Sequence, residues 1–223
     1  YISFCFFQLA LHNYLIVHKK LCLVKKYFLM DSYLNAFCWF LFMKNSIEIV
    51  LIVLSLFSFL IDSNFSMFIS QHRTWLLDKF FEYVINYVSA TLVLSVIFVY
   101  FVIKKRRHIK PYIAAIISSV VLTVAIKAII DRSRPFLVLM LDRMNGISYE
   151  FASWNQSFPS WHTVSFFLII PFIEKKYRLF WVAVATIIGI SRVYSGVHYL
   201  SDVLFGAFLG YMIGKICINY VHA

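Results

Sequence analysis

The sequence predicts an all-α membrane protein: a six-transmembrane-helix bundle with an interfacial amphipathic helix between the first two spans. Composition is the first observation behind this fold class. Of the 223 residues, 62% are hydrophobic and 14% are charged, whereas a soluble domain carries about 45–50% apolar and about a quarter charged residues. The second and third observations are the apolar runs that recur along the chain and the basic clusters that flank them, a pattern typical of membrane proteins.

Six apolar segments approach the length of about 20 residues that a helix needs to cross a bilayer. Backbone polar groups in lipid must bond within their own segment, so these runs are predicted to be helices. The expected spans are Ser46–Ile61, Tyr87–Ile103, Tyr112–Ile130, Trp161–Ile173, Phe180–Tyr194 and Ser201–Val221. We therefore expect one six-span domain over residues 46–221, preceded by an N-terminal segment, residues 1–45.

The beginning of the chain does not resemble a signal peptide. Its basic residues follow its apolar stretch, and no small-residue cleavage site is present. The first residue is Tyr1, and the first methionine is Met30. Our hypothesis is that residues 1–29 are a non-native extension, and we assign them no function.

Between the first two expected spans, Arg73–Val84 has the pattern of an amphipathic helix. Its apolar residues recur near the helical period, and its charged residues fall on the other side. The apolar set is Trp75, Leu76, Leu77, Phe80, Phe81 and Val84, and the charged set is Asp78, Lys79 and Glu82. We expect this helix to lie at the membrane interface, either as a packing element or as a lid or guide for lipid.

Loop charges predict the orientation in the cell membrane. The loop after the second span, Lys104–Lys110, has five Lys and Arg residues, and the loop after the fourth has Lys175, Lys176 and Arg178. Such loops stay on the cytoplasmic side. With six spans, both termini are then cytoplasmic, and the loops after spans one, three and five face outward.

The net charge of +11 would suggest nucleic acid in a soluble protein. Here the basic clusters beside apolar runs account for most of it, so no nucleic-acid partner is expected. The last span carries Gly206, Gly210 and Gly214, four residues apart on one helix face. Small residues at this spacing let helices approach closely. This stripe packs inside one bundle or forms a dimer seam, and the oligomeric state is not predicted.

Ionisable residues at span ends are energetically costly and therefore indicate function. Three blocks of them fall at the ends predicted to face outward: Lys127–Pro135, Pro159–His162 and Ser191–Asp202. Because three separate helix ends meet on one side of the bundle, we expect them to form a single site.

The residue types in these blocks suit a phosphate-sized anion. Lys127, Arg134 and Arg192 are cations that the topology does not require, and arginine binds phosphate oxygens in a bidentate manner. Pro135 is expected to force Arg134 into an extended conformation and to end the span. Ser160 and the backbone N–H groups beginning the fourth span complete the predicted anion site.

Two histidines are the candidate catalytic groups. His198 and Asp202 are four residues apart, so they share a face if Gly196 marks the turn into the last span. A carboxylate on one imidazole nitrogen leaves the other nitrogen free to attack phosphorus. His162, from another helix, is placed to protonate the leaving oxygen.

Other charged groups receive simpler interpretations. Metal binding by the two histidines and Asp202 is disfavoured, because three nearby cations would repel a metal ion; no metal or cofactor is expected. Asp131, Arg132 and Arg143 are interpreted as solvated loop charges.

The three blocks resemble the signature of the type 2 phosphatidic acid phosphatase superfamily, integral-membrane branch. That signature reads K-x6-R-P, then P-S-G-H, then S-R-x5-H-x3-D. The matching residues are Lys127, Arg134 and Pro135, then Pro159, Ser160 and His162, then Ser191, Arg192, His198 and Asp202. Trp161 stands where the family has glycine; it retains the phosphate-binding backbone N–H but puts the substrate range in doubt.

The resemblance implies that His198 is transiently phosphorylated and oriented by Asp202, that His162 protonates the leaving group, and that no metal is needed. Lys127, Arg134, Ser160, Trp161 and Arg192 would hold the phosphoryl group. We expect a hydrolase acting on a lipid phosphate or diphosphate: polyprenyl diphosphate, phosphatidic acid or phosphatidylglycerol phosphate. A lipid-linked phosphotransferase and a catalytically silent lipid-binding homologue stay open as alternatives.

Overall fold

The computed structural model describes residues 46–87, 90–139 and 156–220, all within one compact unit, Met43–Ala223. The predicted N-terminal segment lies outside these residues. The described part is helical, with no strand and one isolated bridge between Ser133 and Gln156. The helices are α3 (Ser46–Ser58), α4 (Asp62–Gln71), α5 (Trp75–Tyr87), α6 (Ala90–Lys104), η2 (Arg106–His108), α7 (Ile109–Ile130), α8 (Pro135–Val138), α9 (Trp161–Ile169), η4 (Ile170–Phe172), α10 (Lys175–Tyr194) and α11 (Leu200–Tyr220).

Within the described residues, three helices are long and apolar enough to cross a membrane: Arg106–Ile130, Lys175–Tyr194 and Leu200–Asn219. A fourth candidate span is the pair α3 and α4, which is bent by 78° at the break between them. Two shorter apolar helices, Leu92–Lys104 and Trp161–Phe172, fall where the sequence predicts further spans. The described chain is therefore a multi-pass membrane protein with the helix order expected from the sequence.

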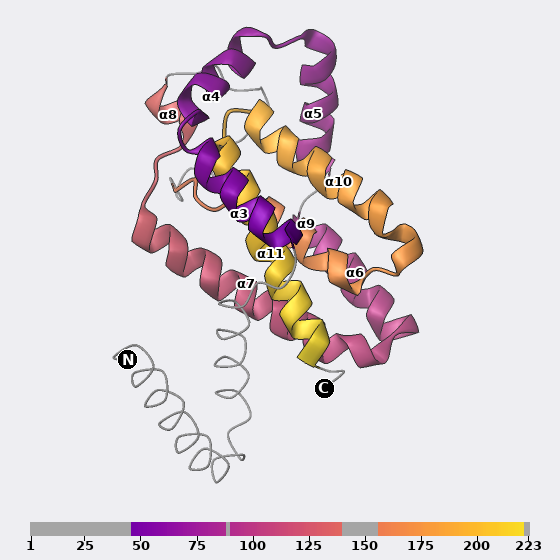
Figure 1. Ribbon diagram of the computed structural model, residues 1–223. Coiled ribbons are helices and arrows are strands. Elements are labelled where there is room, and N and C mark those ends of the chain that lie inside the picture. The colour runs from indigo at the N-terminus through magenta and orange to yellow at the C-terminus, as the bar shows by residue number, and fades with distance from the viewer. Residues whose placement is uncertain (1–45, 88–89, 140–155, 221–223) are drawn as a thin grey trace, which may run out of the picture. The chain divides into compact units, whose positions relative to one another are not determined.

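Helix α11 is central to the bundle: it packs against α9, α3 and α7, and in Figure 1 it runs between α7 and α10. Its glycine stripe explains the contact with α9. A Cβ atom at Gly210 would lie 2.1 Å from the carbonyl oxygen of Val164, and one at Gly214 would lie 2.2 Å from that of Leu168. Of the two interpretations of this stripe, packing inside one bundle is the one observed.

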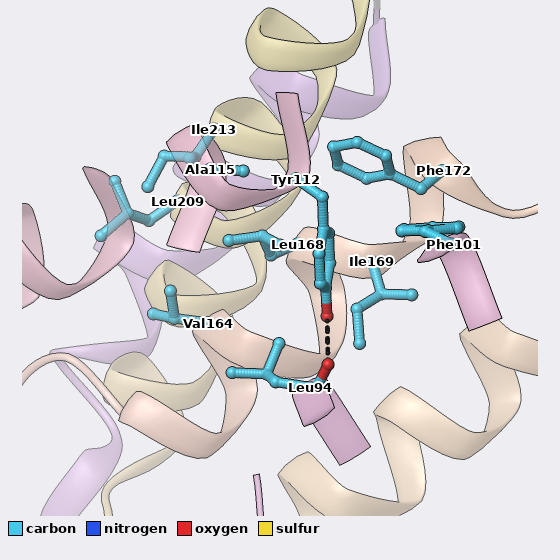
Figure 2. Close-up of a cluster of buried hydrophobic side chains, with 10 residues drawn as sticks. All are labelled: Leu94, Phe101, Tyr112, Ala115, Val164, Leu168, Ile169, Phe172, Leu209 and Ile213. Carbon is cyan, nitrogen blue, oxygen red and sulfur yellow. Dashed lines mark hydrogen bonds between the residues drawn. The ribbon is translucent and has the colours of Figure 1, made fainter. Parts of the chain in front are cut away.

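The largest hydrophobic cluster lies where α6, α7, α9 and α11 meet, and Figure 2 shows its members. The Tyr112 hydroxyl donates to the carbonyl oxygen of Leu94 over 3.0 Å, which satisfies the polar end of a fully buried ring. The same ring meets Phe101 edge-on at a centroid distance of 5.0 Å. This core fixes α9 between its neighbours, and with it the residues at the start of α9.

Helix α5 corresponds to most of the segment Arg73–Val84, which the sequence predicts to be an amphipathic helix. Trp75, Leu76 and Phe80 are exposed, whereas Phe81 is buried against Tyr194 of α10 with ring centroids 4.7 Å apart. The Tyr194 hydroxyl donates to the carboxylate of Asp78 over 2.8 Å. This helix is thus attached to the end of α10 and presents a second apolar face outward.

Candidate active site

The first signature block ends α7 and continues into α8. Asp131 adopts a left-handed conformation with φ 43°, so the helix stops at Ile130 and does not run through to Arg134. Arg134 is extended (φ −75°, ψ 150°), as the following proline predicts, and Pro135 opens α8. Lys127 stays in the last turn of α7 and is buried. The two cations therefore reach the site from a helix and from an extended segment.

The second block begins α9. Ser160 precedes the helix with an extended backbone and is fully buried, and Trp161 and His162 follow in the first turn. The backbone N–H of Ser160 donates to the carbonyl oxygen of Asp202 over 3.1 Å. The start of α9 is thereby joined to the start of α11, and the first N–H groups of α9 have no partner within their own helix.

The third block is the turn between α10 and α11. Gly196 has a positive φ of 71°, a backbone conformation that residues with a side chain rarely adopt. This confirms its predicted role in the turn. The backbone N–H of His198 donates to the carbonyl oxygen of Arg192 over 3.2 Å, and that of Phe136 donates to Gly196 over 3.1 Å. This turn therefore contacts the first block as well as the end of α10.

The structure brings the predicted site residues together around His198. Burial, followed by the positive charges of Arg134 and Lys127, holds the pKa of His198 well below its usual range; Arg192 acts in the same direction. His162 lies within the electrostatic reach of His198, Arg192 and Arg134. At neutral pH the His198 imidazole is accordingly uncharged, which is the nucleophilic form.

Asp202 lies beside His198 without a short hydrogen bond to it. The distance from His198 Nδ1 to Asp202 Oδ2 is 3.5 Å, and Nδ1 has no hydrogen-bond partner within the described residues. The same carboxylate oxygen accepts the backbone N–H of Tyr199 over 2.8 Å. The carboxylate is thus fixed close to Nδ1 of the imidazole.

Arg192 is the most informative cation of the pocket. It is buried, yet its Nε and Nη2 have no hydrogen-bond acceptor anywhere in the described part of the chain. By contrast, Lys127 Nζ donates to the carbonyl oxygen of Gln156 over 2.7 Å, and Arg134 Nη1 reaches that of Val197 at 3.4 Å. Buried charged donors without acceptors are energetically costly. An anion with several oxygens, bound beside His198, would satisfy them.

Two residues that the sequence analysis did not assign to the site are joined to it. Arg132, interpreted above as a solvated loop charge, has a side chain that is only 20% exposed and forms ion pairs with Asp62 and Asp202; that interpretation is wrong. Asp62, at the start of α4, is buried. A carboxylate within an otherwise apolar stretch was the signal for Asp62. Asp131 is exposed, as expected, and Arg143 lies outside the described residues.

The fold and the pocket define a multi-pass membrane protein whose helix ends gather cations around a neutral histidine. The particular family follows from comparison with known proteins. The chain belongs to the PAP2 superfamily, whose family model matches residues 108–223.

Two solved structures share the fold. The structure of LpxE from Aquifex aeolicus aligns with a TM-score of 0.60 at 27% identity, and the alignment covers 72% of this chain and 96% of that one. A transmembrane PAP2-type phosphatidylglycerolphosphate phosphatase from Bacillus subtilis aligns with a TM-score of 0.58 at 20% identity, covering 78% of this chain and 94% of the other.

Two curated relatives match over shorter stretches. The bacitracin transport permease protein BcrC of Bacillus licheniformis is 49% identical over 59 residues, which is 25% of this chain and 29% of that protein. Phosphatidylglycerophosphatase B of Bacillus subtilis is 37% identical over 71 residues, 26% of this chain and 35% of its own length. The chain thus spans about a third of each curated relative.

Proposed function

We propose that this protein hydrolyses the phosphate monoester or diphosphate of a membrane lipid through a phosphohistidine on His198. The observation that carries this proposal is the buried Arg192 guanidinium, whose Nε and Nη2 lack acceptors within the described residues and whose charge acts on His198. A phosphoryl group in line with His198 supplies several acceptor oxygens in the bidentate geometry that arginine prefers.

The proposal gives each predicted residue a role. Lys127, Arg134 and Arg192 neutralise the phosphoryl oxygens, and Ser160 with the Trp161 backbone N–H binds them at the start of α9. Positioning and charge stabilisation of this kind supply most of the catalysis in phosphoryl transfer.

The reaction has two steps. His198 Nε2 attacks phosphorus while the bond from phosphorus to the lipid oxygen breaks, and His162 donates a proton to that oxygen. His162 then accepts a proton from water, whose oxygen attacks phosphorus while the bond from phosphorus to His198 Nε2 breaks, and inorganic phosphate is released. Asp202 keeps Nδ1 oriented through both steps. No step uses a metal ion.

The membrane arrangement is part of the proposal. Residues 46–221 form a six-span phosphatase domain, with α6 and α9 crossing as short spans and α5 lying at the interface. The basic loop Lys104–Lys110 precedes α7, whereas Lys127 is in the last turn of α7. Likewise Lys175 begins α10 and Arg192 is in its last turn. Because basic loops stay cytoplasmic, the pocket faces outward and both termini are cytoplasmic.

An apolar cavity favours a lipid over a soluble phosphate. Its volume is about 620 Å³, and it lies between the α3–α4 pair and helices α9, α10 and α11. The side chains that line it include Phe65, Ile69, Ile190, Val193, Val203 and Leu204. At one end it reaches Tyr194 and Leu200, which flank the turn that carries His198. A hydrocarbon chain in this cavity would leave its headgroup near that turn.

The test is phosphate release by the purified protein in EDTA across a panel of lipids. The panel contains phosphatidylglycerol phosphate, which the name of the Bacillus subtilis relative suggests, together with phosphatidic acid, a polyprenyl diphosphate and a soluble sugar phosphate. We expect turnover of at least one lipid. His198→Ala should lower it by at least about a thousandfold, as loss of a catalytic nucleophile does.

The outcomes separate the alternatives. Turnover that survives His198→Ala would contradict the mechanism. Transfer of phosphate to an added lipid or sugar hydroxyl, in place of release to water, would identify a phosphotransferase. Lipid binding without turnover of any member of the panel would identify a catalytically silent homologue.

A further inference from the structure

Arg132 lies beside Asp202, and its guanidinium is engaged within the protein. Its Nη1 donates to Ser201 Oγ over 2.6 Å and to Asp202 Oδ1 over 2.9 Å. Its Nη2 donates to Asp62 Oδ2 over 2.7 Å. Both terminal nitrogens therefore have acceptors, in contrast to Arg192, whose Nε and Nη2 have none within the described residues.

Two aromatic rings hold the same guanidinium. Its central carbon lies 3.9 Å from the centroid of the Tyr199 ring and 4.8 Å from that of Phe59. Cation–π contacts at such distances strengthen when the cation is shielded from water, and the Arg132 side chain is only 20% exposed. The rings fix the plane of the guanidinium and thus the direction of its donors.

Asp62 connects this cluster to the start of α4. Its side chain is buried, and Oδ1 accepts the backbone N–H of Ser201 over 3.0 Å. Oδ2 accepts the Ser201 hydroxyl in addition to Arg132. The bend between α3 and α4 is therefore attached directly to the first turn of α11, where Asp202 lies.

The Asp202 side chain is therefore fixed by bonds that do not involve His198. Arg132 holds Oδ1, and the backbone N–H of Tyr199 holds Oδ2 over 2.8 Å. The backbone carbonyl oxygen of Asp202 accepts the N–H of Ser160. The separation of 3.5 Å between His198 Nδ1 and Asp202 Oδ2 depends on these bonds, because they fix the carboxylate that faces the imidazole.

We infer that Arg132 and Asp62 are positioning residues, which act on the reaction through Asp202 by fixing the carboxylate that orients His198. This inference rests on the proposed function. Since both terminal nitrogens of Arg132 are engaged by Asp62, Ser201 and Asp202, the arginine is not placed to hold phosphate. Its loss should lower the rate of the chemical step and leave substrate binding nearly unchanged.

The experiment compares kcat and KM of Arg132→Gln, Arg132→Lys and Asp62→Asn with the wild type. We expect kcat to fall roughly tenfold to a hundredfold in Arg132→Gln, the range typical for loss of an outer partner that orients a functional group. KM should stay within about twofold, because uniform binding is untouched. Arg132→Lys retains the charge but not the fork geometry and should recover part of kcat. The kcat of Asp62→Asn should lie between that of Arg132→Lys and that of the wild type.

Arg73→Gln is the matched control. Arg73 Nε pairs with Asp78 Oδ1 over 3.1 Å, so this variant also loses an arginine–aspartate pair, away from Asp202. It should keep kcat within about twofold, as expected for a partly exposed pair. Thermal unfolding in detergent, measured for each variant, reports how much folded protein is assayed.

The failure modes are distinct. If His198→Ala retains turnover, or the wild type has none, the proposed function fails and this inference fails with it. If His198→Ala is inactive but Arg132→Gln keeps more than half of the wild-type kcat, only the positioning role is overturned. A rise in KM equal to the loss in kcat/KM would instead assign Arg132 to substrate binding. Parallel loss of activity and folded protein in all three variants would make the cluster purely structural.

Discussion

Two arginines on opposite sides of the Asp202–His198 pair differ in whether their guanidinium nitrogens have hydrogen-bond acceptors. On the pocket side, Arg192 is buried with two nitrogens that have no acceptor within the described residues. On the α4 side, Arg132 has both terminal nitrogens bonded to Asp62, Ser201 and Asp202. Both guanidinium groups are positively charged and mostly shielded from solvent, so their hydrogen-bond partners are the main difference between them. This difference is the basis for proposing that Arg192 binds the phosphoryl group and that Arg132 positions its neighbours.

The largest effect should come from the pocket side. Arg192→Gln removes the charge and the bidentate donors, and we expect kcat/KM to fall roughly 10²–10³-fold, the usual result of losing a donor to a transition-state oxygen. Orthovanadate, a phosphate analogue, should inhibit this variant more weakly in the same proportion. Unchanged inhibition in Arg132→Gln is the matching control. Equal effects of both substitutions on inhibition would erase the distinction between the two arginines.

The next effect should disturb both sides together. Gly210→Leu places a side chain where a Cβ would already lie 2.1 Å from the Val164 carbonyl oxygen, so α9 has to move away from α11. Overpacking of this kind typically costs about 1–3 kcal/mol. We expect a lower unfolding midpoint in detergent and reduced activity. Ile187→Leu, on an exposed face of α10, is the control; an unchanged midpoint for Gly210→Leu would contradict the close contact.

A smaller effect concerns pH. Burial and the charges of Arg134 and Lys127 lower the pKa of His198 from its ordinary value of 6.5. A lowered pKa keeps the imidazole neutral to more acidic pH, so kcat/KM, which reports the free enzyme, should not decline through His198 protonation until the pH is below 6.5. A decline centred at or above pH 6.5 that follows His198 would contradict the pocket electrostatics. Arg73→Gln should give the wild-type profile.

The smallest effect is expected for Trp161→Gly, which restores the residue usual in the family. The backbone N–H at the start of α9 is kept, so kcat on the preferred lipid should stay within about threefold of the wild type, a difference below 1 kcal/mol. Relative rates across the lipid panel should change, since the half-buried indole beside the first turn of α9 is lost. Complete loss of turnover would show that the indole itself is required.

Sequence reasoning reached the family, the helix order and the local backbone of the site segments because these depend on local signals. The extended Arg134 follows from Pro135, the turn at Gly196 follows from its missing side chain, and the glycine stripe predicts a close helix contact. All three are properties of adjacent residues or of one helix face.

The Arg132 cluster could not be obtained in the same way. Asp62 and Arg132 are 70 residues apart, and their contact depends on the 78° bend between α3 and α4. The sequence does not predict this bend, because Ser58–Asp62 contains no proline or glycine. A charge next to a span end is usually solvated, so the general rule gave the wrong environment for Arg132. Only the fold shows that its partners are buried carboxylates.

The bond between Ser160 N–H and the Asp202 carbonyl, together with the backbone contacts at Gly210 and Gly214, bears on how hybrids of related enzymes are built. The second and third signature segments form one mechanical unit despite the intervening helix. A chimera that takes residues 157–169 from one parent and 200–214 from another would combine two helices whose backbones have to fit each other directly. Exchange of specificity between relatives should therefore move both segments at once.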